Sequence, residues 1–278
     1  MFKPHPIVVF AAYAAAIAVS IFFLYPYWWM LLGAFRSTEN ILTAPLALFP
    51  ESIDFKAFAD VAKVSGVSLW RYIANSLVIT GLSTAIGVGV TALGAYALVR
   101  RPKLLPMRFL RSGFLLTIMY PYMLLVIPVY IVMFKIGLLG TYTGIILFLS
   151  LGPVQFFLFE QFFRTIPTEV IEAAITDGAS EFRIFRSIVM PLAMPVVATV
   201  TIITFLLNWA QWFPVLVVSR SPKTYTLPVA LLNMNGELGV NFQGIMALAI
   251  LTTIPVTIVF LVAQRRVIQG MAEGAVKG

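Results

Sequence analysis

One polar segment between two apolar stretches carries residues that suit recognition of a charged surface. Its spacing runs through Glu172-Ala173-Ala174, Gly178 and Ile188-Val189-Met190-Pro191. The carboxylates of Glu172, Asp177 and Glu181 can pair with basic groups on another molecule, and the two alanines give a helix a low profile that fits a groove. A segment that merely lies on an anionic membrane surface would favour basic residues instead. We therefore predict that this acidic segment docks onto a partner.

Residues that start and stop helices divide the segment into two parts. Pro167 predicts a helix start, Gly178 a C′ position with positive φ, and Ser180 the N-cap of a second helix. Pro191 then opens the next apolar stretch. The sequence thus predicts a helical hairpin over about residues 165–191.

Residue types that serve catalysis or bind metals are scarce. The chain has no Cys, and its single histidine is His5, which argues against a histidine metal site. No Gly-x-x-x-x-Gly-Lys-Ser/Thr phosphate loop is present, so we expect no binding or hydrolysis of ATP by this chain. We expect neither enzyme activity nor a metal site here.

The elements that position the segment belong to a strongly apolar chain. Of 278 residues, 60% are hydrophobic and 11% charged, less than half the charged share of an ordinary soluble domain. Six stretches free of Asp, Glu, Lys and Arg reach the roughly 20 residues that cross a bilayer. They cover residues 7–35, 73–99, 112–134, 136–159, 191–219 and 244–264. Prolines at positions 26, 121, 128, 153, 195, 214 and 255 predict kinks or breaks in them. Because a segment in lipid must satisfy its own backbone, we predict an all-α, polytopic membrane protein with six transmembrane helices in a single domain over residues 1–278.

Basic residues predict the orientation. The net charge of +8 is a topological signal rather than a nucleic-acid surface, because Lys and Arg concentrate in cytoplasmic loops. The connection after the second stretch holds no acid and five bases, Arg100, Arg101, Lys103, Arg108 and Arg111. Alternation then places both termini and the hairpin in the cytoplasm and the 220–243 loop outside.

Uncharged polar and aromatic residues in the apolar stretches suit a neutral, hydroxyl-rich molecule. The candidates are Asn208, Trp209, Gln211, Trp212, Asn75 and Tyr120. Asn208 and Gln211 are three residues apart, as are the two tryptophans, so each pair is expected to share one side of a helix. Amides hydrogen-bond hydroxyls, and indole rings pack on sugar C–H surfaces. The alternative stays open that the tryptophans mark the membrane interface and the amides join helices.

The spacing of the polar segment resembles the EAA loop of ABC importer permeases, with Met190 where that family usually has Leu. The length, the six stretches and the closing run over residues 264–278 resemble the smaller membrane subunit of maltose-type carbohydrate importers. The resemblance implies a permease of the bacterial cytoplasmic (inner) membrane that moves a sugar or oligosaccharide into the cell. An ion-coupled secondary transporter of a neutral solute is the alternative, disfavoured because the stretches lack acids and bases.

The resemblance also implies partners. These are a second homologous permease, two ATPases that bind ATP and Mg, an extracytoplasmic sugar-binding protein, the lipid bilayer and the carbohydrate, with no nucleic acid. Coupling to the ATPases would use Glu172, Ala173, Ala174, Asp177, Gly178 and Pro191. The cytoplasmic C-terminal tail, residues 265–278, would be short and mobile and reach toward the ATPases. In the outer loop, a turn over Asn233-Met234-Asn235-Gly236-Glu237 would enter the cleft of the binding protein, or be a plain surface turn.

Overall fold

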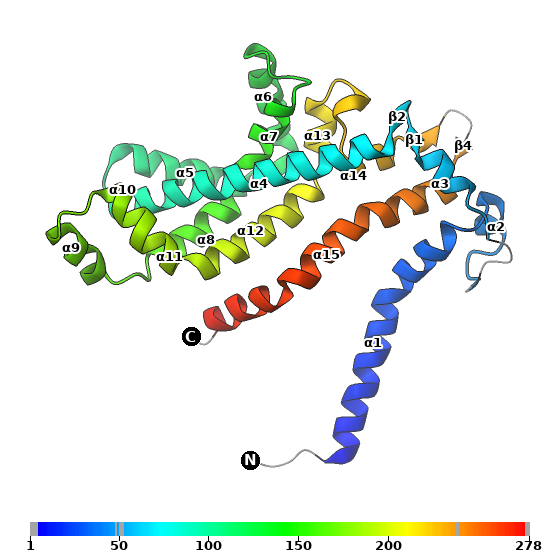
Figure 1. Cartoon of the computed structure of the whole chain (residues 1–278), viewed down its shortest axis with the longest axis horizontal. Helices are drawn as coiled ribbons and strands as arrows, with labels where there is room; N and C mark the ends of the chain where they lie inside the picture. Colours follow the sequence, from blue (N-terminus) through cyan, green and yellow to red (C-terminus); the bar gives the residue numbers. More distant parts are fainter. Residues whose placement is uncertain (1–4, 48, 50–52, 237–238, 276–278) are drawn as a thin grey trace. The chain divides into compact units, whose positions relative to one another are not determined.

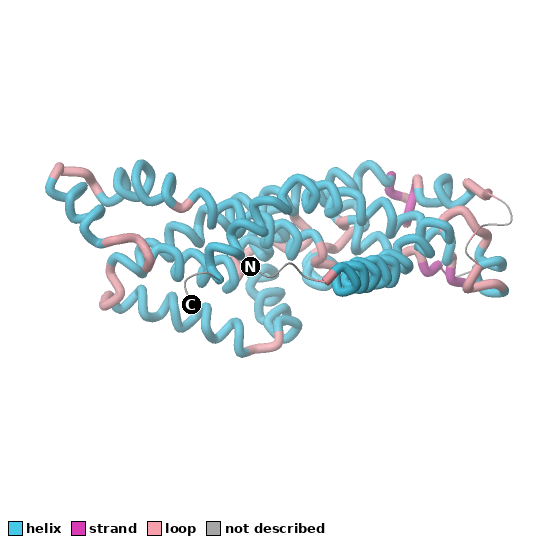
Figure 2. Tube along the Cα trace, turned by 90° about the horizontal axis from the view of Figure 1, so that it is seen from below, coloured by secondary structure: helices cyan, strands magenta, loops and turns pink. Residues whose placement is uncertain are grey.

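The computed structural model describes residues 5–47, 49, 53–236 and 239–275, and helices dominate it (Figure 1 and Figure 2). Up to the hairpin the helices are α1 (Pro6–Gly33), α2 (Thr38–Thr43), α3 (Lys56–Val61), α4 (Leu69–Arg100), α5 (Leu105–Met119), α6 (Tyr122–Lys135), α7 (Tyr142–Ser150) and α8 (Pro153–Phe163). From the hairpin on they are α9 (Thr168–Thr176), α10 (Glu181–Ile184), the π-helix η1 (Phe185–Val189), α11 (Met190–Leu192), α12 (Met194–Trp209), α13 (Phe213–Val218), the 3-10 helix η2 (Pro222–Thr224), α14 (Leu227–Leu232) and α15 (Phe242–Ala275). The strands form two antiparallel pairs, β1 (Lys63–Val64) with β2 (Val67–Ser68) and β3 (Asn235–Gly236) with β4 (Gly239–Val240). The all-α class is confirmed.

Within the described residues, three helices are long and apolar enough to cross a membrane: α1, α4 and the Phe242–Gln264 part of α15. Two bent pairs bring the number to five if each pair is one span. One pair is α7 with α8, bent by 43°, and the other joins Glu181–Leu192 to α12 with a bend of 79°. These helices do not confirm the predicted total of six.

The third apolar stretch is not one helix. α5 ends at Met119, and α6 begins at Tyr122 with Pro121 as its N-cap. Tyr120 has ψ 138°, the extended backbone that the residue before a proline prefers. α5 also begins earlier than predicted, at Leu105, inside the basic connection. The proline therefore splits the predicted span into a 15-residue and a 14-residue helix.

The chain forms two compact units, of which the first comprises residues 1–69 and 231–254. In this unit Gly33 of α1 packs closely on α15, because a Cβ at this position would collide with the Met246 sulfur. The buried Arg36 guanidinium donates to the carbonyls of Asn40 and Ala44, both at 2.6 Å. Gln243 donates to the carbonyl of Asp54 at 3.2 Å. Hydrogen bonds from the buried side chains of Arg36 and Gln243 thus hold the backbone next to α2 and α3 in place.

The second unit comprises residues 70–230 and 255–278, and its core lies between α4, α8, the hairpin helices and α12. Phe156 of α8 stacks on Phe114 of α5 with ring centroids 4.3 Å apart. Gly87 of α4 allows the backbone at the α7–α8 break to approach closely, since a Cβ at this position would collide with the Ser150 carbonyl oxygen. Thr91, one turn further along α4, lies 3.5 Å from the Gln155 amide oxygen. Close packing and buried polar groups together set the position of the bend between α7 and α8.

The C-terminal segment differs from its prediction. α15 continues from the last apolar stretch to Ala275, where a short mobile tail was expected from residue 265. No proline interrupts this segment, and Arg, Gln, Met, Ala and Glu are good helix formers, so two glycines at about 1 kcal/mol each do not stop the helix. Residues 276–278 lie outside the described residues.

Candidate functional site

The polar segment forms the predicted hairpin beyond the C-terminal end of α4 (Figure 1). Pro167 is the N-cap of α9, and the Ser180 hydroxyl caps α10 by accepting from the Arg183 amide. Gly178 has φ +77°, and the next amide, of Ala179, donates to the Ala174 carbonyl at 2.9 Å. This left-handed helix ending is the conformation in which glycine is favoured. The caps and the turn were therefore predicted correctly from the sequence.

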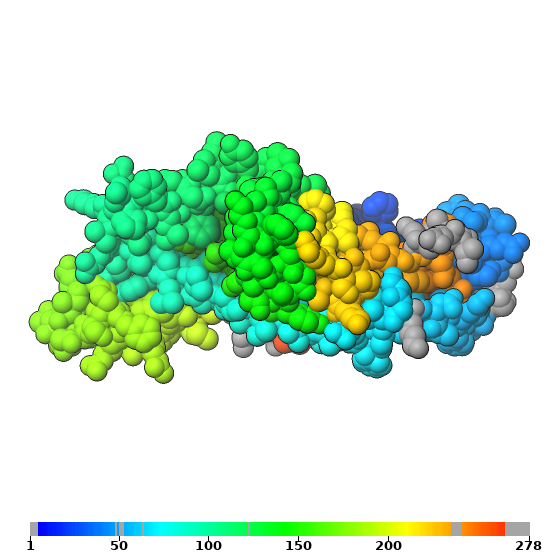
Figure 3. All heavy atoms as spheres, turned by 90° about the horizontal axis from the view of Figure 1, so that it is seen from above, coloured from blue at the N-terminus to red at the C-terminus, as the bar shows by residue number. Residues whose placement is uncertain are grey.

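The exposed surface of α9 is acidic, whereas the second half of the hairpin also exposes Arg183 and Arg186. Glu172, Ala173 and Asp177 are exposed, and neither carboxylate forms an ion pair within the described part of the chain. Figure 3 shows the hairpin atoms, yellow-green, as an open surface of the second unit. Ala174 differs from its prediction, because it is 8% exposed and packs in the core beside Ile171. Adjacent helix residues point about 100° apart, so only Ala173 of the two alanines lies on the open side.

Pro191 lies in α11, after the π-helix η1 and before the sharp bend into α12. It follows the hairpin instead of lying on its open surface, at the second residue of α11, which continues the helical run Glu181–Leu192 directly after the π-helix. Pro191 therefore lies at the entry to α12 and not on the surface that carries Glu172 and Asp177.

One hairpin carboxylate is committed within the chain. Glu181 of α10 accepts from the Arg100 guanidinium at 3.1 Å and from the Tyr96 hydroxyl at 2.9 Å. The hydrogen bond from Arg100 lowers the pKa of Glu181, against an opposing effect of burial. The expected partner of this carboxylate was a base on another protein, whereas in the structure it pairs with the last turn of α4. The two residues are 81 positions apart, so no local sequence pattern could have predicted their contact.

A second ion-pair cluster was not predicted. Glu160 of α8, with its side chain 5% exposed, bonds Arg111 of α5 at 3.2 Å and Arg164 at 2.7 Å. The spacing of Glu160 and Arg164, four residues apart on one helix, was a signal available in the sequence. The cluster joins α5 to α8 at the same end of the second unit as the hairpin.

Two of the substrate-path candidates use their amides within the chain. Asn208 is buried and donates to the Ser83 hydroxyl at 3.0 Å. Asn75 is 4% exposed, donates to the carbonyls of Lys223 and Tyr225 at 3.0 and 2.8 Å, and accepts from the Tyr142 hydroxyl at 2.7 Å. These bonds join α4 to α12, to α7 and to the segment around η2.

The remaining path candidates do not share one helix face with Asn208. α12 ends at Trp209, which is buried and stacked on Phe205, so the expected sharing of one helix side by residues three apart was wrong. Pro214 explains the ending, because its ring would clash with the carbonyl four residues earlier in a continuing helix. Gln211 is half-buried and Trp212 is 40% exposed, both in the break before α13. Tyr120, 57% exposed, caps the end of α5.

The outer-loop candidates lie in the first unit. Asn233 is exposed and Met234 half-buried, and Asn235 and Gly236 form β3, paired with β4. Glu237 lies outside the described residues. Two of the predicted turn residues, Asn235 and Gly236, therefore lie in a short strand.

A model of one protein family matches residues 85–273, a region that includes the hairpin and the core of the second unit. It describes the binding-protein-dependent transport system inner membrane component. The chain belongs to this family. It is a membrane-spanning permease subunit of a binding-protein-dependent ABC importer, which decides against an ion-coupled carrier.

Curated relatives match this permease over nearly its whole length. The diacetylchitobiose uptake system permease protein DasC of Streptomyces coelicolor is 29% identical over 265 residues, 95% of each chain. The sn-glycerol-3-phosphate transport system permease protein UgpE of Brucella abortus is 32% identical over 260 residues, 90% of each chain. The arabinooligosaccharides transport system permease protein AraQ of Halalkalibacterium halodurans is 29% identical over 269 residues, 96% of this chain and 94% of the relative.

Solved structures share the fold. A chain of a bacterial ABC transporter involved in the import of the acidic polysaccharide alginate aligns with a TM-score of 0.78 and 24% identity, over 95% of the permease and 99% of that chain. A chain of the bacterial alginate ABC transporter in complex with an alginate pentasaccharide-bound periplasmic protein aligns with a TM-score of 0.60 and 17% identity, over 92% of each. At these identities the likeness concerns the fold alone.

Proposed function

We propose that the permease imports a sugar or oligosaccharide, with the hairpin of α9 and α10 as its coupling element in the cytoplasm. The observation that carries the coupling role is the arrangement of carboxylates on the hairpin. Glu172 and Asp177 are exposed and have no ion pair among the described residues, whereas Glu181 binds the end of α4. The hairpin can therefore bind a basic partner on one side and transmit its movement to α4 on the other.

The full assembly in this proposal has five proteins. The permease pairs with a second homologous permease, and both stand on two ATPases that bind ATP and Mg, so this chain supplies no catalytic group. An external binding protein delivers the solute, and the turn at Asn233 and Asn235 faces it. Six spans, with both termini inside, complete the topology, with α5 and α6 together forming the third span across their proline break.

The names of the relatives support a carbohydrate as the solute. DasC and AraQ are named for diacetylchitobiose and arabinooligosaccharides, while UgpE is named for sn-glycerol-3-phosphate. The path candidates that are at least partly exposed are Gln211, Trp212 and Tyr120, and their uncharged amide and aromatic rings suit hydroxyl groups better than a phosphate. We therefore place a neutral sugar ahead of a polyol phosphate.

The substrate class is tested by uptake into proteoliposomes that hold the whole importer with its binding protein. Radiolabelled oligosaccharide should accumulate only when ATP is inside the vesicles, and an excess of sn-glycerol-3-phosphate should not compete. Competition by the phosphate compound, with no uptake of any sugar, would assign the importer to polyol phosphates.

The orientation is tested by cysteine labelling in intact cells, since the chain contains no Cys of its own. Lys103→Cys lies in the basic connection and should be protected from a membrane-impermeant thiol reagent. Lys56→Cys, at the start of α3, should react. The opposite labelling pattern would place the hairpin outside and contradict its coupling role.

A further inference from the structure

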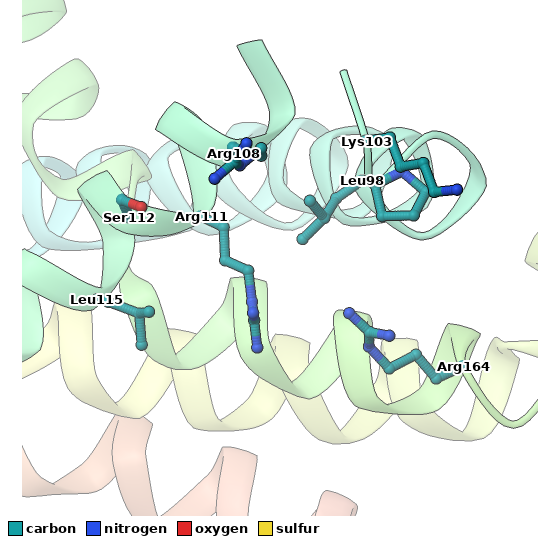
Figure 4. A pocket seen from close by; sticks show the side chains of 8 residues that line it. Leu98, Lys103, Arg108, Arg111, Ser112, Leu115 and Arg164 are labelled. Atoms are coloured by element: carbon teal, nitrogen blue, oxygen red, sulfur yellow. The ribbon is translucent and has the colours of Figure 1, made fainter. Parts of the chain in front are cut away.

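A basic pocket lies at the hairpin end of the second unit, between the end of α4, the first half of α5 and the end of α8 (Figure 4). Its volume is about 420 Å³. Four bases line it: Lys103, Arg108, Arg111 and Arg164. Neither the hairpin contacts nor the proposed solute path uses this pocket.

The charge in the pocket is not balanced by the chain. Glu160 holds Arg111 and Arg164 together through a single carboxylate oxygen, and the two guanidiniums extend toward each other from α5 and α8 (Figure 4). Lys103 and Arg108 form no ion pair in the part of the chain that the structure describes. Four bases and one acid leave three positive charges around one cavity. A multivalent or concentrated anion would satisfy them.

Beside the basic pocket, α5 presents an apolar face. Leu105, Phe109, Leu116 and Met119 are 62%, 69%, 54% and 78% exposed. Their spacing of four, seven and three residues puts them on one side of the helix, next to the side that carries Arg108, Arg111 and Leu115. Leu98 and Leu115 also line the pocket itself. A ligand that fills both regions needs an anionic head and an apolar tail.

We propose that this pocket binds the anionic headgroup of a membrane phospholipid, whose acyl chains lie along the apolar face of α5. Basic pockets between membrane helices on the cytoplasmic side suit such headgroups. Free phosphate would satisfy the bases but would leave the apolar face without a ligand. An acidic protein segment would likewise pair with the bases and leave the apolar face uncovered. The bound lipid neutralises the bases at the junction of α4, α5 and α8 and stabilises the end of the second unit that carries the hairpin.

Native mass spectrometry of the full chain in detergent tests this site, with phosphatidylglycerol as the probe and phosphatidylcholine as the neutral lipid. The parent chain should retain phosphatidylglycerol and not phosphatidylcholine. Lys103→Ala/Arg108→Ala removes two exposed bases without breaking an ion pair, so the fold should persist. Because each base near an anionic headgroup contributes about a fivefold change in affinity, the double variant should bind about 25-fold more weakly.

Lys56→Ala/Lys135→Ala is the matched control, because it removes two exposed lysines that do not line the pocket, and its lipid retention should equal that of the parent. Retention of phosphatidylglycerol by Lys103→Ala/Arg108→Ala at the parent level would overturn the proposal. Displacement of the lipid by millimolar inorganic phosphate would overturn it in favour of a soluble anion. If the double variant kept its lipid but lost binding of the ATPases, the pocket would belong to a protein partner.

Discussion

The two ends of α4 are held in chemically different ways. At its C-terminal end, Arg100 forms an ion pair with Glu181 of the hairpin, and the side chains nearby are charged and exposed. At its N-terminal end, the buried amide of Asn75 binds backbone carbonyls of Lys223 and Tyr225. At the hairpin end, Glu172 and Asp177 have no ion pair among the described residues and can meet another molecule, whereas the amide of Asn75 is already used within the chain.

We therefore expect the hairpin end of α4 to serve binding and the Asn75 end to serve stability. An exposed carboxylate without a partner in the chain costs little in folding and gains when a base approaches. A buried amide with all its bonds made contributes to folding, and its removal leaves carbonyl groups unsatisfied. Substitutions at the hairpin end should therefore alter assembly, and those at the opposite end should alter stability.

The largest effect is expected for Glu172→Ala. Loss of one member of a desolvated charge pair costs about 2–5 kcal/mol when the other charge is left unpaired. Binding of the ATPases, measured by co-purification, and ATP hydrolysis stimulated by the binding protein should both fall with any sugar. Thermal unfolding of the chain itself should not change.

Glu169→Ala is the control for that variant, since it removes an exposed carboxylate from the first turn of the same helix outside the Glu-Ala-Ala run. It should leave assembly close to that of the parent. Equal losses in the two variants would mean that the hairpin is recognised by overall charge and not through Glu172.

Gly178→Val should have the next largest effect. A β-branched residue at φ +77° meets a backbone cost of about 1–3 kcal/mol. A Cβ at this position contacts nothing within 4 Å in the chain, so any additional steric effect must come from a bound partner. Membrane insertion should persist while ATPase assembly or transport falls. Gly178→Asn, which tolerates positive φ better, should restore most of the function; full activity of the valine variant would show a passive loop.

At the opposite end of α4, Asn75→Ala should lower stability by about 1–2 kcal/mol, because it removes three hydrogen bonds and leaves the Tyr225 carbonyl without its donor, while the Lys223 carbonyl keeps Arg71. The measurement is thermal unfolding in detergent, with ATPase co-purification unchanged. A variant that unfolds like the parent but fails with one sugar only would return Asn75 to the solute path.

Gln211→Ala should have the smallest effect on stability, since its half-buried side chain lies in the break between α12 and α13. Assembly and stimulated ATP hydrolysis should match the parent, and uptake should change in a way that depends on the sugar offered. Normal uptake of every accepted sugar would assign this amide to packing.

Local signals in the sequence predicted local structure well. Pro167, Gly178 and Ser180 occupy the hairpin positions expected of them, because caps and positive φ depend on residues within one turn. The helical class and most apolar stretches followed from composition in the same way. Prolines predicted breaks, and the two at Pro121 and Pro214 ended helices that an uninterrupted apolar stretch would have continued.

Contacts between distant residues were not predictable from one sequence. The bond from Asn208 to Ser83 crosses 125 residues, and nothing near either residue indicates it. The inward position of Ala174 depends on which side of α9 meets the core, and two adjacent alanines look alike in sequence. In the sequence, Glu181 could not be distinguished from Glu172 and Asp177, because its ion pair with Arg100 depends on a residue far away in the chain.

The ion pair between Glu181 and Arg100 and the hydrogen bond from Asn208 to Ser83 together restrict how α4 can move. The two bonds join α4 to the α10–α12 segment at positions 17 residues apart on α4, about 25 Å along its axis. Two contacts this far apart oppose sliding of α4 past the α10–α12 segment, although that segment bends by 79° between them. A displacement of the hairpin should therefore reach α4 at both ends of this stretch.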